Sequence, residues 1–439
     1  MKEQIIQQAK KHGVEFIKLQ FTDILGNMKN INITIDLLEK ALDNQIMFDG
    51  SSIDGFARIE ESDMYLYPDL NTFIILPGEI SGSVVEARII CDIYTADGKP
   101  FEGDPRYILK KALAEAAKDG YTMYAGPELE FFLFKLDQNG NPTLTTNDKA
   151  GYFDLSTIDK GHVAKREMCL VLKKMGFVVE ASHHECAPGQ HEIDFKYEDA
   201  LKAADYIITF KAVVKQIAEK YGFYATFMPK PISGIAGSGM HLNMSLFKND
   251  VNAFYDENDE YKLSEIAYSY IAGLLNHAKG LSVITNPNIN SYKRLVAGYE
   301  APVNIAWAFK NRSPLIRIPT AKGNATRVEL RNPDPSCNPY LTIAVSLVAG
   351  LNGIKNSITP PAPANFNIYE QSKKELDNQN IEVLPENLKV ALDYMLKDDL
   401  IKETLGDHVV NTITNAVTKD WNEYQLHITT FEIDRYLHL

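Results

Sequence analysis

The chain has 439 residues, of which 45% are hydrophobic and 23% charged, and its formal net charge is −13. This length exceeds one ordinary core and predicts two domains, and the composition is that of a soluble globular protein. The acidic charge argues against nucleic acid or a membrane surface as a direct partner, and four cysteines without a CxxC pair predict a reducing, cytoplasmic location.

The first hundred residues predict a small domain of short strands. Residues 1–13 have the pattern of an amphipathic helix and not of a signal peptide. Strand patterns at 14–21 and 28–34 flank the turn DILGN, and another strand pattern lies at 84–94. We therefore expect a hairpin early in the chain and a mixed sheet around it.

A turn-rich stretch at 97–105 marks the predicted domain boundary. Asp104 can cap a helix there, and the proline that follows suits the first helical position. We place the two domains at 1–103 and 104–439. Further helical patterns occur at 199–221, 264–279, 338–355 and 386–425. The short strands between these helices predict an α+β fold, in which helices pack around a sheet.

Two glutamates share one face of a predicted strand at 124–134. Because alternate side chains of a strand point the same way, Glu128 and Glu130 lie together, while Leu129 faces the core. Two acids in so apolar a run are costly unless a cation compensates them. The alternative is a sheet face that carries two surface acids.

A second acidic pair lies in HHECAPGQHEIDF, residues 183–195. The Pro-Gly pair predicts a turn, and the resulting hairpin would bring Glu185 and Glu192 together. An acidic surface loop is the alternative.

Two further strand patterns each place three polar residues on one face. These residues are His241, Asn243 and Ser245 of the segment 237–247, and Arg327, Glu329 and Arg331 of the segment 325–331. A histidine satisfied by its neighbours and a salt-bridged surface strand would explain the same patterns.

Together these segments offer five glutamates and one histidine as metal ligands. They are Glu128, Glu130, Glu185, Glu192, His241 and Glu329. Hard oxygen donors suit Mg²⁺ or Mn²⁺, and the imidazole tilts the set slightly toward Mn²⁺. So many carboxylates can hold two metals, the arrangement that clamps a transferring phosphoryl group.

The stretch from 290 to 331 adds the cations that phosphate binding needs. Its basic residues include Lys293, Arg294, Arg312, Arg317, Arg327 and Arg331. Arginine offers a planar fork for a carboxylate or a phosphate, and several of these arginines lie among apolar neighbours. Solvated surface charge is the alternative. The chain has no GxxxxGK[ST] pattern, which argues against a P-loop enzyme.

The order of several long motifs resembles that of type I glutamine synthetases over nearly the whole chain. The motifs include FDGSS (48–52), GPELEFF (126–132), HHECAPGQHE (183–192), GSGMH (237–241), NSYKRLVAGYEAP (290–302) and RVELRNPDP (327–335). The resemblance implies a β-grasp-like N-terminal domain and a larger catalytic domain with a curved antiparallel sheet. It also implies a dodecamer whose active sites are shared between neighbouring subunits, and the synthesis of glutamine from glutamate, ammonium and ATP.

The resemblance further implies a role for individual residues. One metal would be held by Glu130, Glu185 and Glu192, and the other by Glu128, His241 and Glu329. Glutamate would be bound by Gly237, Arg294, Glu300 and Arg331. ATP would be bound by Tyr197, Asn243, Ser245, Arg312, Arg317 and Arg327. Asp49 would take the proton of ammonium, Glu300 would close over the site, and Arg312 would act in catalysis.

The chain resembles the shorter subtype of the family, because no extra segment lies between residues 134 and 177. That subtype is inhibited by glutamine and not by adenylylation. We predict that Arg58 is a regulatory residue that favours a glutamine-bound state, with a plain surface arginine as the alternative. A nitrogen-responsive transcription regulator is a further partner that the resemblance suggests.

Two other functions stay open at this point. A γ-glutamyl-amine ligase would share the first half-reaction but use a larger amine, and the intact FDGSS and GYEAP motifs favour ammonia over it. An inactive relative that serves as a scaffold is the second alternative. The presence of all six proposed ligands argues against that one.

Overall fold

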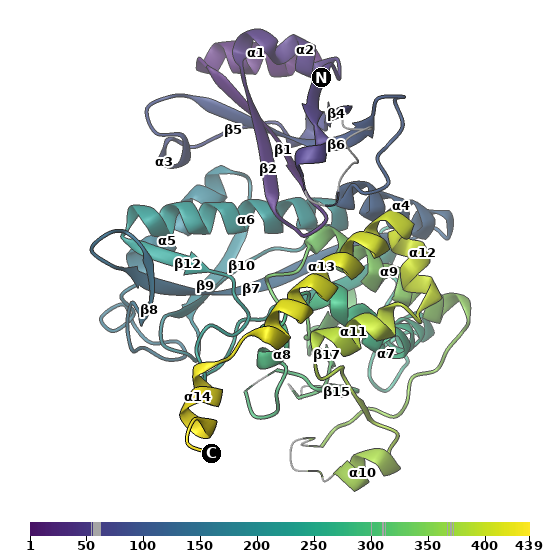
Figure 1. The fold of residues 1–439 in the computed structure, drawn as a ribbon. Coiled ribbons are helices and arrows are strands. Elements are labelled where there is room, and N and C mark those ends of the chain that lie inside the picture. The colour runs from purple at the N-terminus through teal and green to yellow at the C-terminus, as the bar shows by residue number, and fades with distance from the viewer. Residues whose placement is uncertain are drawn as a thin grey trace.

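The computed structural model describes residues 1–53, 55, 63–299, 301–309, 311, 313–366, 368, 371 and 373–439. A small N-terminal part stands on a larger part made of a sheet and helices (Figure 1). None of the helices in these ranges is both long and apolar enough to cross a membrane.

The N-terminal part is a mixed sheet with α1 and α2 on its outer side (Figure 1). Its elements are α1 (Lys2–His12), β1 (Phe16–Thr22), β2 (Met28–Thr34), α2 (Leu38–Leu42), β3 (Ile46–Asp49), β4 (Asp63–Pro68), β5 (Ile74–Ile75), α3 (Gly78–Ser81) and β6 (Glu86–Thr95). The strands follow the order β2-β1-β6-β4-β3, and β5 also pairs with β6. The antiparallel β1–β2 pair confirms the predicted hairpin, and β1 runs parallel to β6.

The larger part begins with α4 (Pro105–Lys118), which starts where the sequence predicts. Asp104 caps this helix by accepting a hydrogen bond from the backbone N–H of Arg106, at 3.0 Å. The buried Arg106 guanidinium pairs with Asp69 of the N-terminal part at 2.7 Å and with Asp205 of the larger part at 2.9 Å. These ion pairs fix the N-terminal part on the larger one.

The larger part is built on a curved sheet around the long strand β7. Its strands are β7 (Thr122–Leu136), β8 (Pro142–Thr146), β9 (Val179–His184), β10 (Gln190–Phe195), β11 (Glu198–Asp199), β12 (Phe223–Thr226), β13 (Met240–Lys248), β14 (Val251–Asn252), β16 (Trp307–Phe309), β17 (Ile316–Ile318) and β18 (Val328–Leu330). The main order is β16-β17-β18-β13-β7-β10-β9. Apart from the parallel β16–β17 pair, its pairings are antiparallel. The strands that carry the predicted ligands are therefore neighbours.

Helices cover this sheet and form a second layer beside it (Figure 1). They are α5 (His162–Lys174), α6 (Ala200–Lys220), α7 (Glu265–Thr285), α8 (Ser291–Arg294), α9 (Pro339–Lys355), α10 (Lys373–Asn378), α11 (Leu388–Met395), α12 (Asp399–Leu405), α13 (Asp407–Leu426) and α14 (Thr430–Tyr436). The short pair β15 (Asn304–Ile305) and β19 (Glu382–Val383) forms a separate small sheet. α6 lies between the sheet and the N-terminal part, whereas α7 packs against α9 and α11.

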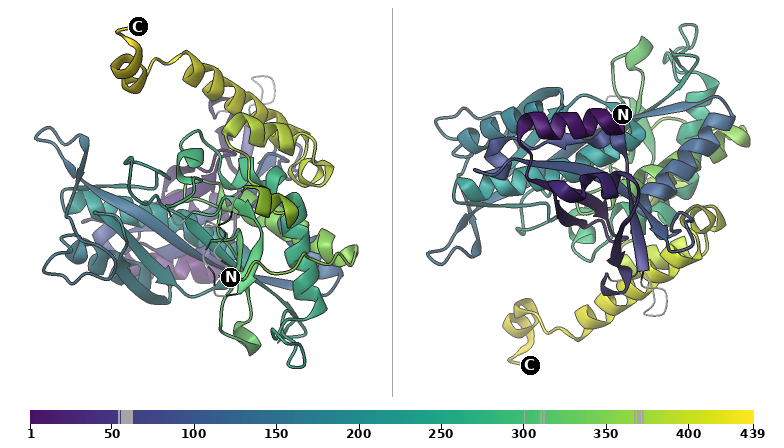
Figure 2. Two further views of the ribbon diagram at one scale, coloured as in Figure 1. Left: turned by 90° about the horizontal axis from the view of Figure 1, so that it is seen from below. Right: turned by 90° about the horizontal axis from the view of Figure 1, so that it is seen from above.

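The helical pattern predicted at 386–425 is confirmed, but the sequence analysis did not predict its breaks. Three helices, α11 to α13, occupy this region, because Asp398 caps α12 and Gly406 takes a φ of +79° between α12 and α13. A left-handed glycine ends a helix at little steric cost. The predicted helix at 264–279 continues to Thr285. After α13 the chain leaves the body and ends in α14 (Figure 2).

Candidate active site

The predicted metal ligands meet at one cavity of about 670 Å³, which we call the acidic cavity. Five of the six line it, namely Glu128, Glu130, Glu185, Glu192 and His241. Glu329 is fully buried behind its wall, with a carboxylate oxygen 4.0 Å from Nδ1 of His241. The surface alternatives for these residues are therefore wrong.

Strand register brings these side chains together. His241 of β13 lies opposite Glu128 of β7, and Glu192 of β10 lies opposite Glu130 of β7. On its other side Glu192 lies opposite His183 of β9. The predicted hairpin is confirmed, since the N–H of residue 185 bonds to the carbonyl of residue 190 at 2.8 Å.

The first group of ligands is Glu128, His241 and Glu329, here called the arginine-paired cluster. Nδ1 of His241 lies 3.3 Å from Oε2 of Glu128. One oxygen of Glu329 accepts a hydrogen bond from Nη1 of Arg331 at 2.7 Å, and the other accepts one from Nε of Arg317. Burial lowers the pKa of His241, with the nearby Arg331 adding to the effect, which keeps a ring nitrogen available as a ligand.

The second group is His183, Glu185 and Glu192, here called the hairpin cluster. Nε2 of His183 lies 2.8 Å from Oε1 of Glu185 and 3.8 Å from Oε1 of Glu192. Sequence reasoning missed His183 and placed Glu130 in this group instead. The missed signal is the register of the hairpin, which sets His183 beside Glu192 once the turn is fixed.

Glu130 lies in the same cavity beside the hairpin cluster. Its Oε2 accepts hydrogen bonds from Nε2 of Gln190 at 3.0 Å and from the N–H of Gly239 at 2.9 Å. Burial and the charge of Glu185 raise the pKa of Glu130 to about 8. Burial and the neighbouring acids, Glu130 first among them, raise the pKa of Glu192 as well.

The donor set fits divalent cations. Buried carboxylates that hold protons for lack of a counter-ion would give them up to a cation of higher charge. Oxygen donors with one imidazole in each cluster match the preferences of Mg²⁺ and Mn²⁺. The residues present therefore suit metals in both clusters, and the donor set does not choose between the two ions.

Three of the four predicted glutamate ligands, Gly237, Arg294 and Arg331, also line the acidic cavity. Arg294 is buried, and its guanidinium donates to the backbone carbonyls of residues 331 and 332 at 3.1 and 2.7 Å. Nε of Arg331 is buried without a hydrogen-bond partner. A Cβ on Gly237 would lie 2.3 Å from the carbonyl oxygen of Pro229, so glycine alone fits there.

Four of the predicted ATP ligands line a second cavity of about 400 Å³, here called the Tyr197 cavity. Among its lining residues are Tyr197, Asn243, Ser245 and Arg327. Nε of Arg327 donates to Oδ1 of Asn243 at 2.9 Å. Arg317 lies instead at the acidic cavity, bonded to Glu329. Glu128 and Asp194 line both cavities, so the two adjoin there.

Asp49 does not line the acidic cavity of its own chain. It ends β3 on the surface of the N-terminal part and accepts hydrogen bonds from the N–H and hydroxyl of Ser51 at 2.9 and 2.6 Å. These bonds lower the pKa of the Asp49 carboxyl. Arg58, Glu300 and Arg312 lie outside the described residues, and their roles stay predictions.

Gln190, Asp194 and Tyr299 are among the further residues of the acidic cavity that were not predicted. Gln190 bonds Glu130, Asp194 reaches both cavities, and Tyr299 lies 3.9 Å from Nζ of Lys230, measured to the ring centroid. Each lies inside or next to a motif that the sequence analysis quotes. Their side-chain directions follow from the fold and not from the motif letters.

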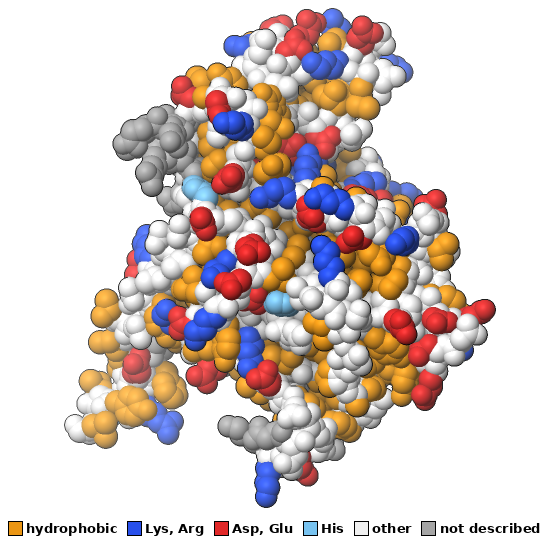
Figure 3. All heavy atoms as spheres, turned by 90° about the vertical axis from the view of Figure 1, so that its right-hand side faces the viewer, with side chains coloured by type: hydrophobic (Ala, Val, Ile, Leu, Met, Phe, Trp, Pro, Cys, Tyr) orange, Lys and Arg blue, Asp and Glu red, His pale blue; other side chains and the backbone are white. Residues whose placement is uncertain are grey.

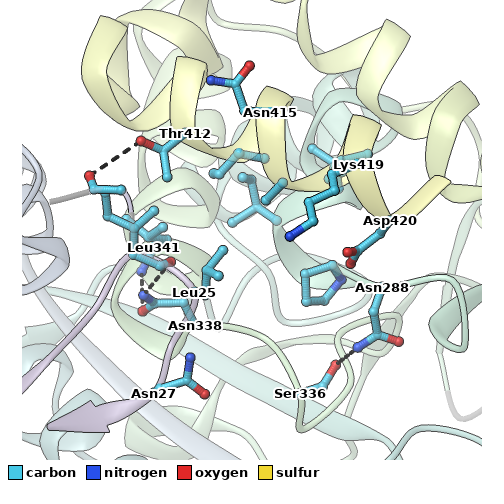
Figure 4. A pocket seen from close by; sticks show the side chains of 18 residues that line it. Leu25, Asn27, Asn288, Ser336, Asn338, Leu341, Thr412, Asn415, Lys419 and Asp420 are labelled. Atoms are coloured by element: carbon cyan, nitrogen blue, oxygen red, sulfur yellow. Dashed lines mark hydrogen bonds between the residues drawn. The ribbon is translucent and has the colours of Figure 1, made fainter. Parts of the chain in front are cut away.

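A third cavity of about 610 Å³ lies between the β1–β2 turn, the start of α9 and α13. Figure 4 shows Lys419 and Asp420 of α13 on one side of it and Asn27, Asn288 and Ser336 facing them. Asp420 is the one acid among its described lining residues. This cavity lacks a cluster of metal-ligating groups, so the acidic cavity is the candidate active site. On the face in Figure 3, acidic and basic side chains are intermixed and neither sign forms a broad patch.

Comparison with known families agrees with this fold. The glutamine synthetase β-grasp domain matches residues 13–96, and the glutamine synthetase catalytic domain matches residues 102–436. The chain therefore belongs to the glutamine synthetase family, and the predicted fold class and family are confirmed.

Individual relatives match over almost their whole length. A glutamine synthetase from Clostridium saccharobutylicum is 57% identical over 99% of this chain and 98% of its own length. One from Thermus thermophilus is 55% identical with the same coverage. A solved GmaS/ADP complex is 31% identical with a TM-score of 0.90 and 99% of each chain covered. These lengths are consistent with the shorter type I form.

Proposed function

We propose that this enzyme forms L-glutamine from L-glutamate and ammonia through a γ-glutamyl phosphate, with ATP as the phosphoryl donor. The observation that carries the proposal is the junction of the two cavities at Glu128 and Asp194. A carboxylate bound in the acidic cavity and the terminal phosphate of a nucleotide in the Tyr197 cavity would meet there, beside both ligand clusters. Family membership and full-length relatives named glutamine synthetase support the same activity.

Each substrate has its own set of residues in this proposal. ATP lies against Tyr197, Asn243, Ser245 and Arg327, and the ADP complex of the GmaS relative supports a nucleotide in this fold. Glutamate binds at Gly237, Arg294 and Arg331 in the acidic cavity. The unpartnered Nε of Arg331 offers a donor to its carboxylate.

Two divalent cations complete the site, one in each ligand cluster, with Glu130 added to the hairpin cluster. Bound there, Mg²⁺ or Mn²⁺ would neutralise charge that builds up on the transferring phosphoryl group. The residues that would hold them are Glu128, His241 and Glu329 on one side, and His183, Glu185, Glu192 and Glu130 on the other.

The chain's own residues supply the rest of the chemistry. An oxygen of the γ-carboxylate attacks the γ-phosphorus of ATP, ADP leaves, and Arg312 and Arg317 stabilise the charge on the phosphoryl oxygens. Asp49 of a neighbouring copy takes a proton from ammonium, and the ammonia attacks the acyl carbon and expels phosphate. Glu300 closes over the site and keeps water from the acyl phosphate.

The same proposal covers assembly and domain division. Asp49 lies on the surface and does not line the acidic cavity of its own chain. In a ring whose neighbouring subunits share active sites, as in a dodecamer, each subunit would supply its Asp49 to the cavity of the next. We place the domain boundary between residues 103 and 104, next to the Asp104 cap, and the enzyme in the cytoplasm. A transcription regulator as partner and glutamine inhibition through Arg58 stay predictions from the resemblance.

The decisive experiment compares amine acceptors. Purified protein with glutamate, ATP and Mg²⁺ is assayed for ADP release and for amide product with ammonium, methylamine and polyamines. Glutamine formation at low ammonium, with little product from the larger amines, is the expected result. Preference for a larger amine would identify the protein as a γ-glutamyl-amine ligase. ADP release without any added acceptor would support neither of these two activities.

A mixing experiment tests the shared site. Asp49→Ala and Arg331→Ala variants are each expected to be inactive, and subunit exchange between them should restore part of the activity. Labelled subunits confirm the exchange. Exchange without any recovery would contradict a site built from two copies.

A further inference from the structure

A buried polar group lies behind the hairpin cluster, on the face away from the acidic cavity. Successive residues of a strand point to opposite faces, so His184 and His191 face away from His183 and Glu192. Both histidines are buried, and Asp148 of the connection before α5 lies beside them with 8% of its surface exposed. The proposed mechanism uses none of these three.

Asp148 binds the turn of the hairpin directly. Its Oδ1 accepts a hydrogen bond from the N–H of Gly189 at 3.0 Å and lies 3.0 Å from Nε2 of His184. Its Oδ2 accepts bonds from the N–H of Lys160 and from Nδ2 of Asn147, both at 3.1 Å. One carboxylate therefore ties the segment 147–160 to both arms of the hairpin.

His184 carries this connection to a predicted ligand. Its Nδ1 donates to the backbone carbonyl of Glu185 at 2.7 Å, while its Nε2 contacts Asp148. On the other arm, Gly189 precedes Gln190, whose amide holds Glu130 at 3.0 Å. The hydrogen bonds of Asp148 thus reach the backbone of Glu185 on one side. On the other side, through the turn, they reach the residue next to Gln190, which orients Glu130.

Asp148, His184 and His191 also have the spacing of a metal site. Their hydrogen bonds argue against a cation, although Asp159 lies nearby, paired with Lys165 at 2.9 Å. Nζ of Lys165 lies 3.4 Å from Nδ1 of His191, and both ring nitrogens of His184 already have partners. A divalent ion there would face the ammonium of Lys165 at close range. The group therefore serves the protein as a hydrogen-bonded support.

We propose that Asp148, acting through His184 and Gly189, is a positioning residue that holds Glu185 and, by way of Gln190, Glu130 at the spacing a divalent cation requires. The inference rests on the proposed function in its use of the hairpin cluster as a metal site. Residues that hold metal ligands from behind typically change metal affinity about 10- to 100-fold when they are replaced. We expect a loss of this size at one of two binding sites.

The test is a Mn²⁺ titration by calorimetry on full-length protein without substrates. Asp148→Asn keeps the shape of the side chain but removes its charge, and it should weaken one class of Mn²⁺ sites about 10- to 100-fold. The other class, at the arginine-paired cluster, should be unchanged. His184→Gln can still donate to Asp148 but has no second nitrogen, on the other side of the side chain, to donate to the carbonyl of Glu185, and it should weaken the same class.

Asp104→Asn is the matched control, because Asp104 is a buried carboxylate that accepts backbone N–H bonds far from the acidic cavity. It should lower the melting temperature and leave both Mn²⁺ affinities unchanged. If Asp148→Asn and His184→Gln behave like this control, Asp148 is structural only and the proposal is overturned. Loss of a third Mn²⁺ equivalent in Asp148→Asn would overturn it too, in favour of a cation between Asp148 and the histidines. Glutamine synthesis by the unmodified protein tests the proposed function separately.

Discussion

The two ligand clusters of the acidic cavity differ in how their charge is balanced. In the arginine-paired cluster, Glu329 is fully buried and bonded to both Arg317 and Arg331. In the hairpin cluster, Glu185 and Glu192 contact the imidazole of His183 and no arginine among the described residues. Burial and mutual repulsion accordingly raise the pKa of Glu130 and Glu192.

Because of this difference, burying the carboxylates without metal costs less free energy in the arginine-paired cluster than in the hairpin cluster. A buried carboxylate paired with arginines keeps its charge, whereas a buried carboxylate among other acids takes up a proton or needs a cation. The arginine-paired cluster is therefore preformed without metal. The hairpin cluster depends on the metal for its charge and on Asp148 for its shape.

The largest expected effect is on synthesis, and it is the same for both clusters. Glu329→Gln and Glu192→Gln should each lower glutamine formation by at least about a hundredfold, more than the loss of an outer partner of a ligand typically costs. The measurement is glutamine formed per minute at saturating substrates and Mg²⁺. Glu219→Gln, on an exposed position of α6 outside both cavities, is the control and should keep full activity. A variant that retains normal synthesis would remove its cluster from the site.

The free energy of unfolding of the metal-free protein should respond differently to substitutions in the two clusters. Without metal, Glu329→Gln leaves the buried Arg331 without its carboxylate and should destabilise the protein, by about 3 kcal/mol for one broken buried pair. Glu192→Gln removes an acid that is repelled by its neighbours, and it should leave the metal-free protein as stable as before or more so. Denaturant unfolding in the presence of a chelator gives both values. Equal losses in the two variants would contradict the difference in charge balance.

The pH dependence follows from the raised pKa values. Glu130 has a pKa of about 8 when folded against an ordinary 4.5, and the pKa of Glu192 is raised in the same direction. Between these limits the folded chain holds more protons than the unfolded chain, so the free energy of unfolding falls as pH rises from about 4.5 toward 8. Metal replaces those protons. Mn²⁺ should therefore raise the Tm more at pH 8 than at pH 6, and Glu192→Gln should reduce that difference.

Much of this site follows from strand periodicity alone. The alternation of β7 and β13 predicted which face carries Glu128, Glu130 and His241, because a strand has a fixed period of two and its apolar face must be buried. The β9–β10 hairpin was predictable for a similar reason, since its Pro-Gly turn is local.

The missed features depend on contacts between distant segments. His183 became a candidate ligand only through its register against Glu192, and Asp148 lies 36 residues from the His184 that it contacts. Neither relation has a local pattern. The break at Gly406 was missed for a different reason, because the apolar spacing on both sides of it continues as in one helix. Whether Asp49 reaches a neighbouring site depends on a second copy of the chain.

The smallest expected effect concerns the Tyr197 cavity, which adjoins the acidic cavity at Glu128 and Asp194. Tyr197 is 45% exposed, its ring meets Tyr124 edge-on at 5.8 Å, and Nζ of Lys196 lies 5.7 Å from the ring centroid, so part of the ring is accessible to a base. Stacking of a base on an aromatic ring contributes about 1 to 3 kcal/mol, which corresponds to a rise in the KM for ATP of roughly fivefold or more in Tyr197→Ala. Tyr197→Phe should restore the KM, and Tyr224→Ala, a similarly exposed tyrosine on β12, is the control. Because the ring touches neither cluster, Mn²⁺ affinity should not change. A Tyr197→Ala variant with altered metal binding and an unchanged KM for ATP would place the nucleotide elsewhere and join this cavity to the metal site instead.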